Sequence, residues 1–208
     1  MSAPSGTLVG IVDDDPSVRK GLARLVKGSG YRVEVFASAR EFLARPQQED
    51  PCCLLLDVRM PGLTGLELQE ALATAGRRMS IVFVSGHGDV VGSVKAMKGG
   101  AVDFLTKPID ARELLGAIER AVAKALTTQR EQAEATDVQG RLKTLTAREA
   151  QVFALVVTGM LNKQIAAELG IVEKTVKVHR ARVMEKMRAG SLAELVRLAD
   201  RAGIVAKP

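Results

Sequence analysis

Carboxylate, hydroxyl and ammonium side chains follow four of the five short apolar segments in the first half of the sequence. They are Asp13 and Asp14 after the first segment, Asp57 after the third, Ser85 after the fourth and Lys107 after the fifth. Carboxylate oxygens are ligands that Mg²⁺ prefers, and a carboxylate can accept a phosphoryl group as a nucleophile. A metal ion, an ammonium group and a hydroxyl stabilise such a group in transfer through charge neutralisation and positioning. This set of side chains therefore predicts the formation of an aspartyl phosphate.

Two kinds of segment alternate along this half and must position the reactive side chains. Strands are expected at Leu8–Val12, Arg32–Phe36, Cys53–Leu56, Ile81–Val84 and Asp103–Thr106. Helical spacing of apolar residues is found at Ser17–Lys27, Ala39–Ala44, Gly65–Ala75, Val90–Lys98 and Ala111–Leu126. Five strands that are each followed by a helix are typical of an α/β fold with a doubly wound parallel sheet. Because ligands of such sheets bind at the carboxyl ends of the strands, we expect the reactive side chains to converge on one edge.

Four motifs of this half resemble the receiver domains of two-component response regulators. They are Ile11–Arg19, Leu55–Gly62, Ile81–His87 and Phe104–Pro108, and the resemblance covers about residues 6–126. It implies a (βα)5 flavodoxin-like receiver in which Asp57 is the phosphoacceptor. Asp13 and Asp14 would hold Mg²⁺, with Asp14 as the more direct ligand. A histidine kinase would then be the phosphoryl donor.

The same resemblance implies roles for residues around the phosphoacceptor. Arg59 would give the metal its backbone carbonyl, Ser85 would be the switch hydroxyl, Phe104 the switch aromatic residue and Lys107 the phosphate-contacting lysine. The Lys107–Pro108 peptide bond is a candidate for the cis form. After transfer, phosphoryl oxygens can attract the Ser85 hydroxyl, and Phe104 can turn into the space released. We interpret His87 as a loop residue and Asp89 as the N-cap of the fourth helix.

The second half of the sequence predicts helices only, and it is basic. Residues 142–208 contain 12 Lys and Arg against 6 Asp and Glu, whereas residues 1–124 contain 16 against 15. A basic segment of this kind suggests a polyanion as the partner. Helices are expected after Thr146 up to Gly159, at Lys163–Leu169 with Asn162 as N-cap, at Glu173–Met187, and from Ser191 to about Ala202. The second and third of these form a helix-turn-helix whose basic third helix suits the major groove of DNA.

Short motifs in this half together resemble the LuxR-type helix-turn-helix of the FixJ/NarL response-regulator family. They are Thr146–Glu149, Asn162–Ala166 and Lys174–His179, and the resemblance covers about residues 142–205. It implies that Glu173–Met187 is the recognition helix. Base contacts are expected from Lys177 and Val178, and from Arg180 or Arg182 because Ala181 stands where some relatives carry a base-contacting lysine. Phosphate contacts are expected from Asn162, Lys163, Lys174 and Lys186.

These observations predict a receiver domain at 6–126, a DNA-binding domain at 142–208 and a linker at 127–141 that can extend the fifth helix. Phosphorylation would either drive dimerisation or release the DNA-binding domain, and both readings stay open. In the phosphorylated state we expect a homodimer that binds double-stranded operator DNA with a roughly palindromic sequence. Without an apolar run of 18 residues, no membrane span is expected. The adjacent cysteines, Cys52 and Cys53, suit a reducing cytoplasm.

Two alternative functions are weighed against this one. A DNA-binding regulator with a non-signalling receiver would not need the acidic residues, the hydroxyl and the lysine that this sequence keeps at the strand ends. A Mg²⁺-dependent phosphatase of the haloacid-dehalogenase type also uses a strand-end Asp as nucleophile, but expects a second Asp two residues later. Arg59 stands at that position. We therefore expect a regulator and not an enzyme.

Overall fold

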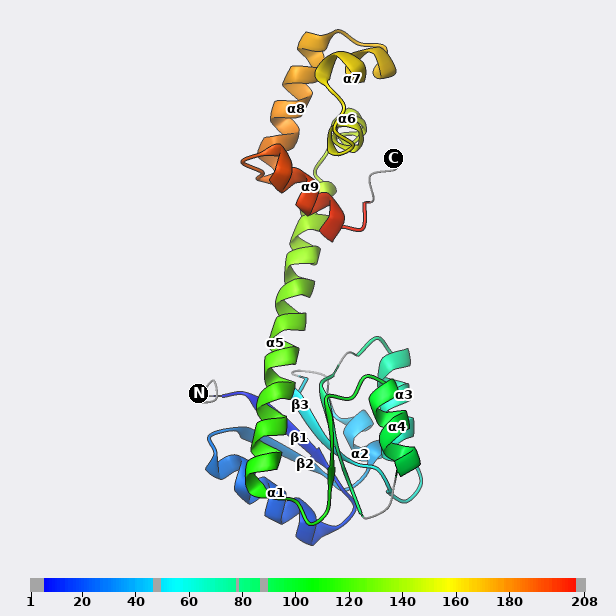
Figure 1. Ribbon diagram of the computed structural model, residues 1–208, viewed down its shortest axis with the longest axis vertical. Coiled ribbons are helices and arrows are strands. Elements are labelled where there is room, and N and C mark those ends of the chain that lie inside the picture. Colours follow the sequence, from blue (N-terminus) through cyan, green and yellow to red (C-terminus); the bar gives the residue numbers. More distant parts are fainter. Residues whose placement is uncertain (1–5, 47–49, 78, 87–89, 205–208) are drawn as a thin grey trace. The chain divides into compact units, whose positions relative to one another are not determined.

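The computed structural model describes residues 6–46, 50–77, 79–86 and 90–204, and the chain forms two compact units. The first unit ends at Thr128 and the second begins at Gln129. Figure 1 shows a sheet flanked by helices in the first unit and a group of helices in the second. No helix in the described ranges is long and apolar enough to cross a membrane.

A parallel sheet of five strands, in the order β2-β1-β3-β4-β5, forms the centre of the first unit. The strands are β1 (Leu8–Val12), β2 (Arg32–Phe36), β3 (Cys53–Asp57), β4 (Ile81–Ser85) and β5 (Asp103–Thr106). All residues of β1, β3 and β4 are buried, because helices cover both faces of the sheet. The predicted doubly wound fold is thus confirmed, with β3 and β4 each one residue longer than expected. The extra residues are Asp57 and Ser85.

Five helices formed by the described residues belong wholly or partly to this unit. They are α1 (Pro16–Gly28), α2 (Ala39–Ala44), α3 (Gly65–Thr74), α4 (Val90–Lys98) and α5 (Ala111–Leu142). Apolar residues of α1 and α5 pack with Ile11 and Leu55 on one face of the sheet. Phe42 of α2 and Leu68 of α3 pack on the other face with Leu56. The two layers fix the strands between them and leave the carboxyl ends of β1, β3 and β4 at one edge.

Helix α5 includes all of the segment that the sequence indicated as a linker. Its residues from Gln129 onward belong to the second unit, and Val138 is only 2% exposed in the core of that unit. Residues 127–141 are therefore helical, and their last turns pack as part of the second unit rather than as a free connection.

The second unit also contains α6 (Ala147–Val157), α7 (Asn162–Leu169), α8 (Glu173–Met187) and α9 (Leu192–Arg201). Thr146 and Glu149 form the expected capping box of α6. Asn162 was expected to be the N-cap of the second helix, but it is the first helical residue, and Leu161 occupies the cap position. The Leu161 N–H donates to Gln164 Oε1 at 2.7 Å, which satisfies one backbone donor at the start of α7, although Leu161 offers no cap side chain. A core of aliphatic residues, including Val152, Val176, Val183, Met187 and Leu195, holds the four helices together.

Candidate phosphorylation site and nucleic-acid interface

Asp13, Asp57 and Lys107 meet at the carboxyl edge of the sheet. Lys107 Nζ donates to Asp13 Oδ2 at 2.8 Å and to Asp57 Oδ1 at 2.7 Å. Asp13 is 1% exposed and Asp57 6% exposed, so both carboxylates are largely withdrawn from water. Residues that are 94 and 50 positions from the lysine are brought together because β1, β3 and β5 run parallel and end at the same edge.

Burial and the neighbouring charges have opposite effects on the pKa values of Asp57 and Lys107. Burial raises the pKa of the Asp57 carboxyl, and the hydrogen bond and charge of Lys107 only partly offset this effect. Burial by itself would lower the pKa of Lys107, but its hydrogen bonds to Asp13 and Asp57 prevail and raise the pKa. The ammonium therefore stays charged and partly neutralises two carboxylates that would otherwise repel each other.

Backbone amides hold the two buried carboxylates in place. The Asp15 N–H donates to Asp13 Oδ1 at 2.8 Å, and the Arg59 N–H donates to Asp57 Oδ2 at 2.7 Å. Asp15 also caps α1, and the hydrogen bonds from the Ser17 and Val18 amides lower its pKa. Each of the two buried carboxylates thus keeps a fixed orientation at the edge of the sheet.

Ser85 ends β4, the strand that pairs with the strand of Asp57, and Phe104 lies on β5, on the far side of β4. Ser85 is 1% exposed, and its Oγ has no hydrogen-bond partner among the described residues. The half-buried Phe104 ring lies 6.4 Å from the Phe83 ring, centroid to centroid. The Lys107–Pro108 peptide bond is cis, as the sequence suggested. His87 and Asp89 lie outside the described residues.

The described carboxylates do not form a preorganised metal-binding site. No group of three or more His, Cys, Asp or Glu side chains among the described residues is arranged to hold a metal ion. Asp14 is exposed, while Asp13 and Asp57 share the Lys107 ammonium instead. The donor set still suits Mg²⁺, because two carboxylates held by one cation lie close together and present oxygen ligands.

Gly65 is a residue of this site that the sequence did not single out. A Cβ built on it would lie 2.1 Å from the Asp57 carbonyl oxygen and 3.1 Å from Leu56 Cγ. Its N–H donates to the Val58 carbonyl at 3.1 Å, which fixes the start of α3 against the end of β3. The sequence could have indicated this residue. Glycine is a poor helix former, and here it is the first residue of a predicted helix, shortly after the Leu55–Gly62 motif. We infer that the site needs this close approach of two backbones.

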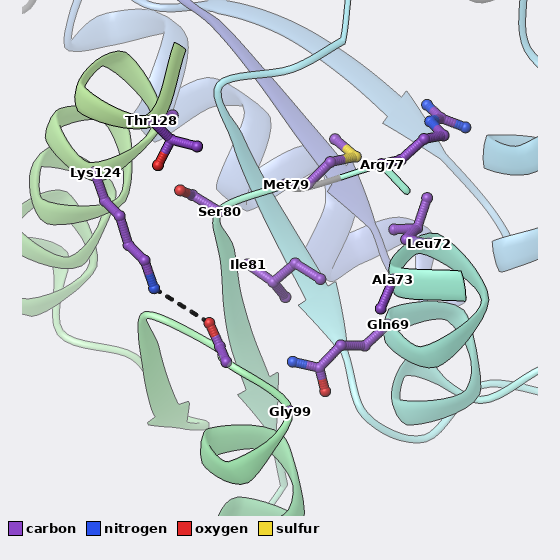
Figure 2. A pocket seen from close by; sticks show the side chains of 12 residues that line it. Gln69, Leu72, Ala73, Arg77, Met79, Ser80, Ile81, Gly99, Lys124 and Thr128 are labelled. Atoms are coloured by element: carbon purple, nitrogen blue, oxygen red, sulfur yellow. Dashed lines mark hydrogen bonds between the residues drawn. The ribbon is translucent and has the colours of Figure 1, made fainter. Parts of the chain in front are cut away.

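A cavity of about 310 Å³ lies elsewhere in the first unit. Figure 2 shows Lys124 and Thr128 of α5 on one side of it, with Gln69, Ser80 and Ile81 on the others. Ile81 begins β4, whereas Ser85 ends it at the edge of the sheet that carries Asp57. The cavity therefore lies at the opposite edge of the sheet. The described residues that line it include no carboxylate, and it is therefore separate from the acidic site.

The side chains expected to bind DNA differ in how freely they extend from the second unit. Lys163, Lys174, Lys177, Val178 and Arg182 are exposed. Lys177 pairs with Glu173 at 3.4 Å, an exposed ion pair of the kind that contributes little to stability. Arg180 is half-buried and donates to Asn162 Oδ1 at 3.0 Å, so these two residues link α8 to the start of α7.

Lys186 was expected as a phosphate contact of the recognition helix, and the structure leaves its side chain 33% exposed while its ammonium bonds within the unit. Lys186 Nζ donates to Glu149 Oε2 at 2.6 Å and to the Thr144 carbonyl at 2.9 Å. Glu149 is 2% exposed, and a buried carboxylate requires such a partner. Lys186 therefore links α8 to the start of α6, a role that helical spacing within α8 could not reveal.

Acid should weaken the second unit through Glu149. The hydrogen bond from Lys186, followed by that from the Thr146 amide, lowers the pKa of Glu149 from 4.5 to about 2. A carboxyl whose folded pKa is depressed stabilises the fold above its unfolded pKa and loses that contribution as the pH falls. We expect the free energy of unfolding, measured in urea, to fall between pH 4.5 and about 2 and the Glu149→Gln variant to lack this part of the dependence. The Glu168→Gln variant, at an exposed position on α7, is the control and should follow the wild type. Equal pH profiles for Glu149→Gln and the wild type would contradict the assignment.

Comparison with known proteins agrees with both halves of the chain. The model of the response regulator receiver domain matches residues 9–119, and that of the bacterial regulatory proteins of the luxR family matches residues 143–199. Nodulation protein W of Bradyrhizobium diazoefficiens is 45% identical over 204 residues, which cover 98% of this chain and 90% of that protein. The transcriptional regulatory protein FixJ of Azorhizobium caulinodans is 43% identical, covering 97% and 95%. The solved structure of the response regulator StyR is 43% identical, with a TM-score of 0.82 and coverage of 95% and 100%.

The fold, the buried acidic site and the helix-turn-helix define a receiver joined to a DNA-binding domain. This chain belongs to the response-regulator family that joins a receiver domain to a LuxR-type DNA-binding domain. Its function is the phosphorylation-activated regulation of transcription. The prediction made from the sequence is confirmed at this level.

Proposed function

We propose that Asp57 is the residue phosphorylated in this protein and that a histidine kinase is the donor. The observation that carries this proposal is the pairing of a single ammonium, Lys107 Nζ, with both Asp57 and Asp13 at a buried strand end. An Asp57 carboxylate oxygen would attack the phosphorus of a phosphohistidine. The new O–P bond would form as the N–P bond breaks, and the imidazole would leave. Lys107 would then neutralise part of the charge on the transferred group.

Mg²⁺ is the cofactor that we propose for this step. Asp13, Asp14, Asp57 and the backbone carbonyl of Arg59 would hold it. The ion would supply positive charge to the phosphoryl oxygens during transfer. Lys107 would move from its bridge between the two carboxylates towards the phosphoryl group.

Ser85 and Phe104 are proposed to report phosphorylation to the surface. The Ser85 hydroxyl is buried at the end of β4, the strand next to that of Asp57, and has no partner among the described residues, so a phosphoryl oxygen would satisfy it. Movement of that hydroxyl would open space for the half-buried Phe104 ring. The surface altered in this way would include α4 and β5.

For the second domain, we propose that α8 binds the major groove of a palindromic operator as part of a phosphorylation-dependent homodimer. We propose residues 6–126 as the receiver and 142–208 as the part of the second unit that binds DNA, with the last turns of α5 packed on it. We propose the cytoplasm as the location. Light scattering after size exclusion, with and without beryllofluoride as a mimic of the aspartyl phosphate, tests the dimer. A doubling of mass with beryllofluoride supports dimerisation. An unchanged mass with increased DNA affinity would favour release of the DNA-binding domain.

Lys177 is proposed to contact a base, together with Val178, and Arg180 or Arg182 would read a neighbouring base. Lys163, Lys174, Asn162 and Lys186 would contact phosphates. Lys177→Ala should weaken specific binding by about 1–3 kcal/mol and relax preference at one base position. Fluorescence anisotropy with selected and scrambled duplexes measures the effect, and Lys143→Ala, at an exposed lysine before α6, serves as the control. An equal loss on both duplexes would instead identify Lys177 as a phosphate contact.

A further inference from the structure

The last turns of α5 are built into the DNA-binding unit. Val138 is buried in its core, and Gln139 Nε2 donates to the Ala202 carbonyl at the end of α9 at 3.0 Å. Leu114 and Ile118, near the start of the same helix, are buried in the receiver core. One continuous helix thus contributes buried side chains to both units.

Arg141, in the last turn of α5, contacts the recognition helix directly. Its Nη1 donates to the carbonyl of Met187, the last residue of α8, at 2.9 Å. This carbonyl is among the four at the end of a helix that lack partners within the helix. A guanidinium suits that position, because its charge also interacts favourably with the negative end of the helix dipole. Asp137, one turn earlier in α5, pairs with the same guanidinium and holds it in place.

Two hydrogen bonds connect the C-terminal turn of α8 to the end of α5 and the segment directly after it. Lys186 donates to the carbonyl of Thr144, two residues after α5 ends, and Arg141 donates to the carbonyl of Met187. The Thr144 N–H and hydroxyl in turn both donate to the Arg141 carbonyl, at 3.0 and 2.6 Å. The end of α5, the segment after it and the end of α8 therefore form one hydrogen-bonded group.

We propose that Arg141 is a positioning residue that couples the receiver to DNA recognition, because through it the last turns of α5 set the orientation of α8 within the second unit. This inference rests on the proposed function, in which phosphorylation of the receiver changes DNA affinity. A change in how α5 packs on the receiver would reach α8 through the Arg141–Met187 hydrogen bond. Arg141 lies within the segment that the sequence indicated only as a linker, and it would not itself touch DNA.

A second link from α5 to the rest of the unit provides a matched control. Arg201 of α9 pairs with Glu134 of α5 at 2.7 Å, but these side chains are 56% and 55% exposed. Exposed pairs of this kind contribute little energy, because water screens them and both side chains must be ordered. The Arg141 side chain is only 22% exposed and bonds a helix-end carbonyl. We therefore expect Arg201→Gln to behave as the wild type and Arg141→Gln to differ.

The test uses the full chain and a DNA duplex that the wild type has selected from a random-sequence pool. The dissociation constant is measured with and without beryllofluoride, and the ratio of the two values is the gain from activation. We expect Arg141→Gln to lower this gain by about fivefold, the lower end of typical allosteric couplings. Arg141→Lys, which keeps a charged donor, should restore part of the gain. Thermal unfolding of each variant reports whether the fold is intact.

The outcomes separate this proposal from the function on which it rests. A purely structural role for Arg141 would lower stability or weaken DNA binding equally in both states, and an unchanged gain in Arg141→Gln would overturn the proposal. An equal loss of gain in Arg201→Gln would also overturn it, because any contact of α5 would then suffice. If Arg141→Gln does not fold, the partly conservative Arg141→Lys decides, and a gain equal to that of the wild type counts against the proposal. A wild type with no gain would overturn the proposed function as well.

Discussion

Replacing Asp57 with Asn should abolish phosphorylation of the chain by acetyl phosphate and Mg²⁺ and remove the rise in DNA affinity that follows. Asn keeps the shape of the side chain and an oxygen that can accept from the Arg59 amide, but its amide cannot act as the nucleophile. The fold should persist. Because burial raises the pKa of Asp57, the buried carboxylate opposes folding at neutral pH, and a neutral side chain should not reduce the free energy of unfolding through this term. Intact mass spectrometry measures the phosphoryl group, and DNA affinity is measured in parallel.

The exposed Asp200 of α9 offers a control, since Asp200→Asn should accept phosphate as the wild type does. Phosphorylation of the Asp57→Asn variant at the wild-type level would show that another residue is the acceptor. A wild type that takes up no phosphate would favour the alternative of a phosphorylation-independent regulator. Sustained hydrolysis of a generic phosphoester, many times per second, would favour the phosphatase.

Gly65→Ala should damage the same site without touching a reactive group. The added methyl would lie 2.1 Å from the Asp57 carbonyl oxygen, a backbone atom that cannot rotate away as a side chain does. Either the start of α3 or the end of β3 must shift, and overpacking of this kind costs about 1–3 kcal/mol. A shift of about 1 Å in a reacting group can slow a reaction by about a hundredfold. We therefore expect a lower free energy of unfolding, measured in urea, together with much slower phosphorylation by acetyl phosphate.

Gly21→Ala is the matched substitution. Gly21 lies within α1, and a Cβ built on it has no neighbouring atom within 4 Å. Alanine at such a helical position should stabilise the protein by about 0.5–1 kcal/mol, because glycine loses more backbone entropy on folding. Normal phosphorylation of Gly65→Ala at wild-type stability would show that the close approach at Asp57 is not required.

The sequence alone determined the elements and the edge at which chemistry could occur. Alternation of apolar runs with helical spacing predicted five parallel strands, because the periods of strands and helices differ. Once the strands are parallel, Asp13, Asp57, Ser85 and Lys107 must share one edge. The capping box of Thr146 and Glu149 was equally local, since its partners lie three residues apart.

Contacts between distant residues could be decided only by the tertiary structure. The sequence placed Lys186 on an exposed helical face, but its partner Glu149 lies 37 residues away on another helix. Arg141 read as part of a polar linker, yet its guanidinium meets a carbonyl 46 residues away. The role of Gly65 was also missed in the sequence, because the backbone atom that excludes a side chain there belongs to Asp57, at the end of β3. Helical and strand periodicities report which face of an element is buried, whereas the groups that meet that face are fixed only when the elements pack.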